Sequence, residues 1–172
     1  IVARRKAFCD RLKVVAKETH HRLSGGKEDL EVRYVTQIEG MSAQECRQSA
    51  FDLFDKSIKR DFEMRYTTVG CQRDDIKFFV NGTDVREFGS QGQQRTVALS
   101  LKLAELTVFK EMTGDYPVLL RDDVLSELDI NRQKQLLVFD ERLQIVLTAT
   151  HIEEGLKKDI KYRSFSIRNG EV

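Results

Sequence analysis

The chain has 172 residues, of which 40% are hydrophobic and 33% are charged, and its formal net charge is +1. This length is enough for one ordinary domain, or for one and a half small lobes, and the composition is that of a soluble globular protein. No apolar run approaches the length of a membrane span and no signal peptide precedes the first expected helix, so we expect a cytoplasmic protein without a membrane partner.

The cysteine pattern excludes two further classes. The three cysteines, Cys9, Cys46 and Cys71, are widely spaced, without a Cys-x-x-Cys pair and without His at zinc-finger spacing. Neither a disulfide framework nor a zinc site is therefore expected, and all three side chains are expected to be reduced thiols.

Residues 1–66 are expected to form a mostly helical subdomain with one short strand. Apolar residues at helical spacing predict a helix over residues 2–23, which a Ser-Gly-Gly run ends. The alternating pattern of residues 30–35 predicts a half-exposed strand. Ser42, with Glu45 three positions later, is a capping box that begins a second helix. The buried stripe of that helix is expected to comprise Ala50, Phe54, Ile58 and Phe62.

The first helix is locally basic. Residues 1–23 hold Asp10, Glu18 and seven basic side chains, which are Arg4, Arg5, Lys6, Arg11, Lys13, Lys17 and Arg22. Such a face either neutralises the phosphates of a nucleic-acid backbone or is a solvated surface, and the pattern alone leaves both readings open.

From residue 67 onward, short strands alternate with helices. Residues 76–80 predict a strand that turns at Asn81-Gly82 and resumes at Val85. A helix over residues 91–112 carries two apolar stripes and should be covered on two sides. The stripes are Val97, Leu101, Ala104 and Val108, and Leu99, Leu103 and Leu106.

The remaining elements predict a parallel α/β sheet, because strands and helices alternate. Gly114 and Pro117 precede a strand over residues 118–121, which should be buried on both faces apart from Arg121. A helix from Asn131 to about residue 143 follows, then strands over residues 144–148 and 163–167 and an Asn169-Gly170 turn.

Two adjacent carboxylates, Asp122 and Asp123, follow the predicted strand of residues 118–121. In an open parallel sheet, ligands bind beyond the carboxyl ends of the strands. At that position Asp122 would hold Mg²⁺ while Asp123 orients an attacking water. The alternative is an acidic turn that caps the following helix.

A turn rich in Gly and Gln opens the helix of residues 91–112. Ser90 is a suitable N-cap, and the unpaired backbone N–H groups of a helix N-terminus attract phosphate. Gly92 leaves room for close approach of the backbone, and Gln93 and Gln94 supply neutral donors. The alternative is a well-capped helix that binds no ligand.

Taken in order, these segments resemble the RecF family of ABC-type ATPases. Residues 90–95, Ser-Gln-Gly-Gln-Gln-Arg, look like the family's ABC-type signature, and residues 119–129 resemble its Walker B strand and D-loop. Residues 70–75 and 116–118 also fit the family pattern. The resemblance implies an α/β fragment of an ABC-ATPase-like head, with a parallel sheet, flanking helices, a signature helix and a Walker B strand. Residues 67–172 would be the C-terminal part of this ATPase lobe, joined to the helical subdomain of residues 1–66.

The resemblance also implies roles for individual residues. Asp122 matches the Walker B magnesium carboxylate, and Asp123 occupies the position of the catalytic base. Ser90 and Gly92 would meet the γ-phosphate of a nucleotide held by the other subunit, and the D-loop would lie across the dimer interface. His151 stands near the place of a γ-phosphate sensor, a lone exposed histidine being the alternative. The implied nucleotide-binding residues are Ser90, Gln91, Gly92, Gln93, Gln94, Ser126, Asp129 and His151.

Three departures from the family pattern stand out. Arg121 replaces a residue that is usually aliphatic. Cys71-Gln72 replaces the usual Pro-His. For the loop that follows, the alternative to a functional role is a surface ion pair between Arg73 and Asp74 or Asp75. The third is that the sequence contains no Gly-x-x-x-x-Gly-Lys followed by Ser or Thr, the loop that cradles phosphates. Since this loop is N-terminal in the family and the chain starts at Ile1 in mid-pattern, we expect a C-terminal half that is inactive alone.

For the intact protein, the resemblance implies a slow, DNA-stimulated ATPase that acts as a recombination mediator in DNA repair and replication restart. It would dimerise on ATP and Mg²⁺, clamp single-stranded, double-stranded or gapped DNA, and work with other recombination mediator proteins. One alternative is a metal-dependent nuclease or phosphatase built on Asp122, Asp123, Glu127 and Asp129. Another is a non-catalytic interaction module that kept the fold.

Overall fold

The computed structural model describes residues 1–122, 125, 129–140, 142–152, 154–158, 161–167 and 171. It divides into two compact units, residues 1–112 and 113–172, and each is described by itself. Asp123, Ser126 and Glu127 and the expected Asn169-Gly170 turn lie outside the described residues. The expected lobe boundary near residue 66 stays a prediction, although strands from both sides of it pair in one sheet of the first unit.

The first unit is built on a three-stranded antiparallel sheet in the order β1 (Leu30–Val35), β2 (Asp75–Val80), β3 (Thr83–Asp84). In its register Leu30 faces Val80 and Val32 faces Phe78, so apolar side chains gather on one face of the sheet. The other face carries exposed residues such as Glu31. This alternation is what the sequence pattern of residues 30–35 predicts, and the strand bounds are confirmed.

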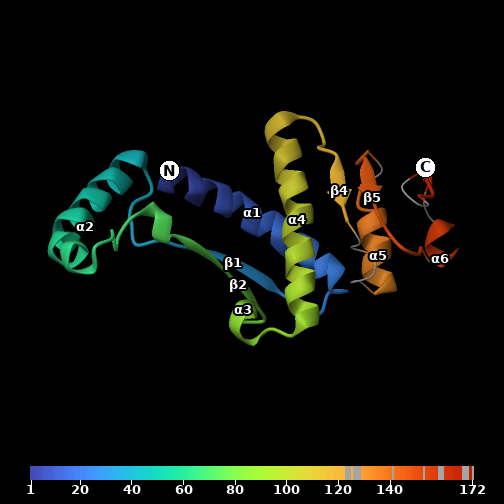
Figure 1. The fold of residues 1–172 in the computed structure, drawn as a ribbon, viewed down its shortest axis with the longest axis horizontal. Coiled ribbons are helices and arrows are strands. Elements are labelled where there is room, and N and C mark those ends of the chain that lie inside the picture. The colour runs from blue at the N-terminus through green and yellow to red at the C-terminus, as the bar shows by residue number, and fades with distance from the viewer. Residues whose placement is uncertain are drawn as a thin grey trace. The chain divides into compact units, whose positions relative to one another are not determined.

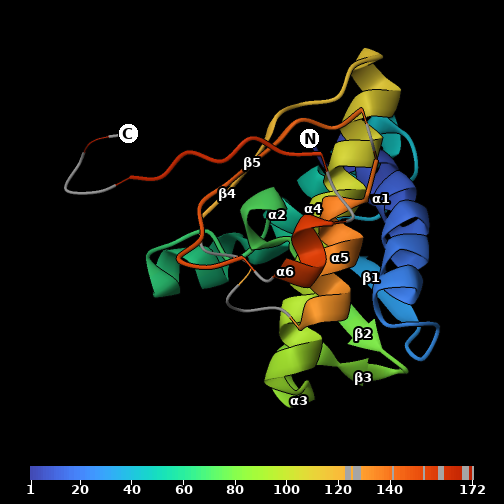
Figure 2. The ribbon, with the colours of Figure 1, turned by 90° about the vertical axis from the view of Figure 1, so that its right-hand side faces the viewer.

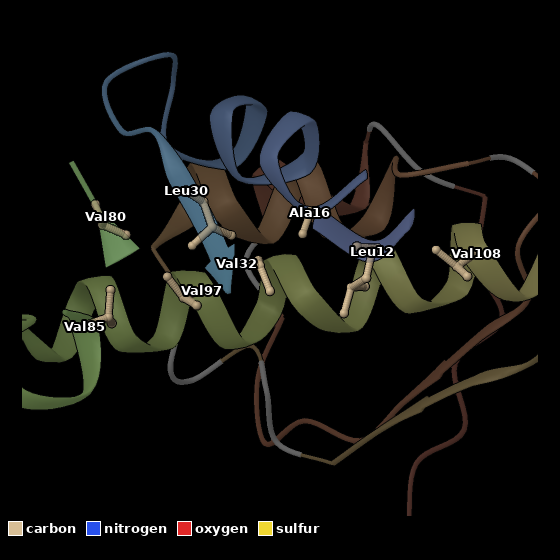
Figure 3. Close-up of a cluster of buried hydrophobic side chains, with 9 residues drawn as sticks. Leu12, Ala16, Leu30, Val32, Val80, Val85, Val97 and Val108 are labelled. Carbon is tan, nitrogen blue, oxygen red and sulfur yellow. The ribbon is translucent and has the colours of Figure 1, made fainter. Parts of the chain in front are cut away.

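Two long helices, α1 (Val2–Leu23) and α4 (Gln91–Thr113), contribute to the core that covers the apolar face of this sheet (Figure 1). Figure 3 shows the core side chains gathered between α1, β1 and α4. They are Leu12, Ala16, Leu30, Val32, Val80, Val85, Val97, Ala104 and Val108. Leu99, Leu103 and Leu106 of the second stripe of α4 are also buried. The prediction that this helix is covered on two sides is therefore confirmed.

The second helix, α2 (Ala43–Met64), lies beside the N-terminal end of α1 (Figure 1). Ser42 and Glu45 form the predicted capping box. The predicted buried stripe is wrong beyond Ala50, because Phe54, Ile58 and Phe62 are exposed. Ala50 packs toward Val2 and Ile38 together with Cys46 and Leu53, which lie outside the predicted stripe. Periodicity predicts an amphipathic helix, but the neighbour decides which face is covered.

The hairpin after β2 turns at Asn81 and Gly82, which have φ of 50° and 82° as this turn requires. The strand does not resume at Val85, as the pattern predicted. Instead the short β3 ends at Asp84, whose carboxylate accepts a hydrogen bond from the amide of Arg86 and caps α3 (Val85–Phe88). The Asp84 cap stabilises a helical turn where alternation alone favours a strand.

The second unit contains the parallel pair β4 (Leu119–Arg121) and β5 (Ile145–Leu147), with the helices α5 (Ile130–Leu137) and α6 (Glu154–Lys157). Figure 2 shows the two strands running side by side. The predicted parallel pairing is confirmed, and the α/β class with it. Burial of β4 on both faces is wrong, because Leu119 is buried whereas Val118 is 52% and Leu120 69% exposed. No described helix of the chain is long and apolar enough to cross a membrane.

Two further predictions in this unit are corrected. The helix predicted to reach residue 143 ends at Leu137, and Asp140 then accepts hydrogen bonds from Arg142 and from the hydroxyl of Tyr116, which hold a loop in place of another helical turn. Residues 163–167 are described and form no strand. Their alternating Phe165 and Ile167 side chains are exposed, so the pattern has no neighbouring strand to pair with among the described residues.

Candidate functional site

The parallel strands β4 and β5 bring two oxygen-bearing side chains together at their carboxyl ends. Asp122 follows the last residue of β4, and Thr148 follows the last residue of β5. The amide of Thr148 donates to the carbonyl of Arg121 at 3.0 Å, and its hydroxyl donates to Oδ1 of Asp122. The structure thus places Asp122 where ligands bind in open parallel sheets, as the sequence predicts.

The Asp122 carboxylate is exposed, and one of its oxygens already has a hydroxyl donor. Mg²⁺ takes oxygen ligands, commonly one or two carboxylates together with waters and phosphate oxygens, so Asp122 fits this cation. Within the described part of the chain, no group of three or more His, Cys, Asp or Glu side chains gathers as a closed metal site. A cation here would therefore take its remaining ligands from water and substrate.

Asp129, in contrast, is the N-cap of the helix that follows it, α5. Its carboxylate accepts hydrogen bonds from the amides of Asn131 and Arg132 at 3.1 Å each and caps α5, and it also pairs with the Arg132 guanidinium at 2.6 Å. Burial of the Asp129 carboxyl raises its pKa, but the hydrogen bonds from Arg132 and Asn131 outweigh burial and hold the pKa below its usual value. Helix capping, which the sequence left open for Asp122 and Asp123, is thus performed by Asp129.

Two other candidates lie near the same strand ends. His151 is exposed and follows Thr148 by three residues, so it stands beyond the carboxyl end of β5. Arg121 is half-buried, and its Nε is buried without a hydrogen-bond partner among the described residues. The stem of Arg121 therefore packs on the same side of β4 as Leu119.

The Gly- and Gln-rich turn forms a well-defined tip at the start of α4, here called the signature tip and comprising residues 90–94. The Ser90 hydroxyl accepts a hydrogen bond from the amide of Gln93 at 3.2 Å, while Oε1 of Gln93 accepts from the amide of Ser90 at 3.1 Å. This reciprocal pair is a capping box with Gln in the third position. Ser90, Gln91 and Gly92 are exposed.

The capping box leaves backbone donors unpaired at the signature tip. Among the described residues, no acceptor binds the amides of Gln91 and Gly92. Unpaired N–H groups at a helix N-terminus carry partial positive charge and favour anions, phosphate in particular. The tip therefore offers phosphate two exposed amides and the hydroxyl of Ser90.

The glutamine side chains behave differently from the prediction that they supply donors to a ligand. Nε2 of Gln93 donates to Oε1 of Glu28 at 3.0 Å. Nε2 of Gln94 lies within hydrogen-bond distance of the carbonyls of Val85, at 3.2 Å, and Gly89, at 3.3 Å. Both amide groups thus bind their own chain, because carbonyl and carboxylate acceptors from other segments lie within reach of the tip.

Two glycines, one just before the capping box and one within it, have different structural roles. A Cβ on Gly89 would lie 2.5 Å from the carbonyl oxygen of Val85, which is a clash. A Cβ on Gly92 would meet only Oγ of Ser90, at an ordinary 3.9 Å. The fold therefore requires glycine at 89, whereas at 92 glycine keeps the outer surface of the tip free of a side chain.

Gly92→Ala should stabilise the chain by about 0.5–1 kcal/mol, because alanine loses less conformational entropy in a helix and meets no clash here. Urea unfolding followed by circular dichroism measures this difference. Gly89→Ala is the matched comparison and should destabilise the chain. A loss of stability in Gly92→Ala as large as that in Gly89→Ala would show that the fold itself requires Gly92.

The basic face of α1 is largely paired within the chain. Five of its basic side chains contact acidic or carbonyl groups of other residues, namely Arg5, Lys6, Arg11, Lys13 and Lys17. Exposed pairs of this kind contribute little to stability, yet they reduce the positive charge available to a polyanion. Contact between this face and DNA stays a prediction.

The loop of residues 70–75 is tied to α1. Arg5 donates to the Asp74 carboxylate at 2.9 Å, and Asp75 lies 3.6 Å from the Arg86 guanidinium. The prediction that Arg73 pairs with one of these carboxylates is therefore wrong, because no ion pair among the described residues includes Arg73. Both carboxylates have other cationic partners, supplied by elements that the sequence pattern does not connect with this loop.

Sequence reasoning missed several polar residues around the two sites. The sequence pattern predicts only the end of a strand at Thr148, although a hydroxyl at that place faces the carboxylate of the neighbouring parallel strand. It predicts no role for His20 or Glu28. The available signal was in α4, where the polar residues Thr96 and Ser100 lie at the spacing of its apolar, buried positions.

Comparison with known proteins relates the whole chain to one group. It is 42% identical over 174 residues to the DNA replication and repair protein RecF of Clostridium botulinum strain 657, and 41% identical over 175 residues to RecF of Clostridium novyi strain NT. Each alignment covers 100% of the chain and 47% of the relative, so the chain spans about half the length of the curated relatives it matches. No family model matches the sequence.

Solved structures agree with this relationship. The chain matches a recombination mediator protein RecF with ATPrS, of the RecFOR pathway, at a TM-score of 0.77 and 36% identity, over 88% of the chain and 41% of that structure. It matches RecF with ATP, of the same pathway, at a TM-score of 0.76 and 37% identity over the same shares. The fold is therefore that of part of the RecF ATPase, and the resemblance found in the sequence is confirmed.

Proposed function

Because the chain is, along its whole length, a homologue of the C-terminal half of the RecF proteins, we propose that it is part of an ATP-dependent DNA-binding recombination mediator. One observation carries this proposal: the signature tip is exposed, with the amides of Gln91 and Gly92 unpaired among the described residues. An exposed anion-binding tip that the chain itself leaves unoccupied suits a nucleotide held by another subunit.

The two sites would act on opposite nucleotides of a closed dimer. The signature tip of one subunit binds the γ-phosphate of the nucleotide on its twin through the backbone amides of Gln91 and Gly92 and the hydroxyl of Ser90. At the strand ends, Asp122 would hold Mg²⁺, with Thr148 orienting its carboxylate. Asp123, outside the described residues, would orient the attacking water, and we assign His151 and the D-loop residues Ser126 and Asp129 to nucleotide contacts in the dimer.

Nucleotide bridging would control DNA binding. Two nucleotides, each bound by groups from both subunits, favour the closed dimer, and loss of the γ-phosphate removes the ligand of the signature tip. Closure around DNA would then depend on ATP, and slow hydrolysis would set how long the clamp stays shut. We place this activity in the cytoplasm, on single-stranded, double-stranded or gapped DNA, together with other recombination mediator proteins.

The phosphate loop must come from the part of the relatives that the chain does not span. A reconstituted full-length protein, in which the chain replaces the matching half of the Clostridium botulinum relative, supplies it. This protein should be a monomer with ADP and a dimer with ATP and Mg²⁺ in light scattering, and it should retain DNA only in the dimeric state. A monomer with every nucleotide, at concentrations where nucleotide is bound, would contradict the proposal.

A further inference from the structure

A chain of hydrogen bonds runs from the buried interior of the first unit to the signature tip. His20 of α1 is fully buried, with Nδ1 2.9 Å from Oγ of Ser100 and Nε2 3.1 Å from Oε2 of Glu28. The second carboxylate oxygen of Glu28 accepts from Nε2 of Gln93 at 3.0 Å. Glu28 thus connects a buried imidazole with the glutamine that caps the tip.

The hydroxyl of Ser100 indicates that Nδ1 of His20 carries a hydrogen. This hydroxyl donates to the carbonyl of Thr96 at 2.7 Å, so its oxygen accepts from the Nδ1–H of His20. The Nε2 atom of the ring then faces the Glu28 carboxylate at 3.1 Å. The two atoms lie within hydrogen-bond distance, and this contact orients Glu28.

Glu28 has two fixed acceptor oxygens as a result. One faces the imidazole and the other faces Gln93, whose own Oε1 accepts from the amide of Ser90. The Gln93 side chain is therefore held at both ends, by Glu28 and by Ser90. A second connection reaches the tip through α4, where the Thr96 hydroxyl donates to the carbonyl of Gly92 at 2.6 Å.

The arrangement is more than a helix cap requires. Ser90 and Gln93 complete the capping box without Glu28, and a carboxylate in the loop between α1 and β1 has water available to it, since its side chain is 19% exposed. A buried histidine, on the other hand, stabilises the fold only if its polar atoms are paired. The network therefore connects a buried polar group with the signature tip and its unpaired amides.

We propose that Glu28 and His20 are positioning residues for the signature tip: they hold Gln93 so that the amides of Gln91 and Gly92 keep the geometry that receives the γ-phosphate. This inference rests on the proposed function for its role in dimerisation. Neither residue touches the nucleotide in this arrangement, and Glu28 acts through Gln93. The network also gives α1 and the loop after it a direct connection to the nucleotide-bridging surface.

Glu28→Ala tests the proposal in the reconstituted full-length protein. It should weaken ATP-driven dimerisation about tenfold, the effect of losing a hydrogen bond to a charged group, while nucleotide binding by the monomer is unchanged. Glu28→Gln should restore dimerisation, because its oxygen accepts from Gln93 and its amide donates to Nε2 of His20. Glu31→Ala, in an exposed pair with Arg33, is the matched control and should dimerise normally. Equal dimerisation by Glu28→Ala and the unmodified protein would overturn the proposal.

A double-mutant cycle separates positioning from general destabilisation. If Glu28 acts through Gln93, then Glu28→Ala should have no further effect on dimerisation in a Gln93→Ala background. Independent losses that multiply in the double variant would show that Glu28 acts by another route and would overturn the proposal.

A measurement without nucleotide distinguishes failure of this proposal from failure of the proposed function. In the 172-residue chain, amide hydrogen exchange at Gln93 and Gln94 should be about tenfold faster in Glu28→Ala than in Glu31→Ala, because the tip opens locally. Exchange at Leu103, in the core, should change by a much smaller factor than exchange at the tip. If exchange at the tip is faster in Glu28→Ala but the reconstituted protein never dimerises, the positioning role stands and the proposed clamp is wrong. Unchanged exchange would reject the positioning role itself.

Discussion

Replacing Asp122 with Asn in the reconstituted full-length protein should lower the rate of ATP hydrolysis at least about a hundredfold, the usual effect of removing one electrostatic group aimed at the reacting phosphate. The Asn side chain keeps the shape of Asp and can still accept the Thr148 hydroxyl bond seen in the structure. It lacks the negative charge that holds Mg²⁺. Phosphate release under saturating ATP and DNA measures the rate.

Asp115→Asn is the control for this experiment, because Asp115 is an exposed carboxylate in the loop before β4. It should hydrolyse ATP at the unmodified rate. Thermal unfolding of both variants should match that of the unmodified protein, since Asp122 is exposed and its loss leaves no buried group unpaired. If Asp122→Asn hydrolysed ATP at the rate of Asp115→Asn, the assignment of Asp122 to the magnesium site would be wrong.

Ser90→Arg should abolish ATP-driven dimerisation of the reconstituted protein while the monomer still binds nucleotide. Ser90 is exposed at the signature tip, next to the unpaired amides of Gln91 and Gly92. An arginine there places a long, hydrated side chain on the surface that must approach the partner's nucleotide closely. It also removes the side-chain acceptor of the capping box, which costs about 1 kcal/mol of stability. Analytical ultracentrifugation with ATP and Mg²⁺ measures the dimer.

Two further variants separate the possible causes. Ser90→Ala removes the cap without adding bulk, and it should retain weaker dimerisation. Glu87→Arg places the same side chain at an exposed position outside the tip, with a larger change of net charge, and should dimerise normally. Dimers of normal strength in Ser90→Arg would show that the tip does not contact the twin subunit.

Elements decided by near neighbours were predictable from the sequence. The helix of residues 2–23 agrees with α1, and the capping box at Ser42 and Glu45 forms as expected. The parallel pairing of β4 with β5 follows from strands that alternate with helices. These features depend on periodicity and on hydrogen bonds between residues a few positions apart, and the local sequence is enough to predict both.

The errors share one physical cause, which is the absence of information about neighbours. Phe54, Ile58 and Phe62 form a proper helical stripe, yet nothing in the first unit covers them, so they are exposed. Residues 163–167 alternate like a strand, but a strand also needs a partner for its backbone hydrogen bonds. Leu120 is as apolar as Leu119, and only the arrangement of the second unit decides which of the two is buried.

By itself the sequence determined the helices with their caps, the parallel strands, and the two residue patterns that mark the signature tip and Asp122. It also determined the family resemblance that the comparisons confirm. Only the tertiary structure decided that Thr148 faces Asp122, that the glutamine amides of the tip bind their own chain, and that Glu28 joins His20 to Gln93. Thr148 and Asp122 are 26 positions apart, Glu28 and Gln93 are 65 apart, and His20 and its other partner Ser100 are 80 apart. Contacts over such separations form only when the packed core brings α1, β1 and α4, or β4 and β5, together.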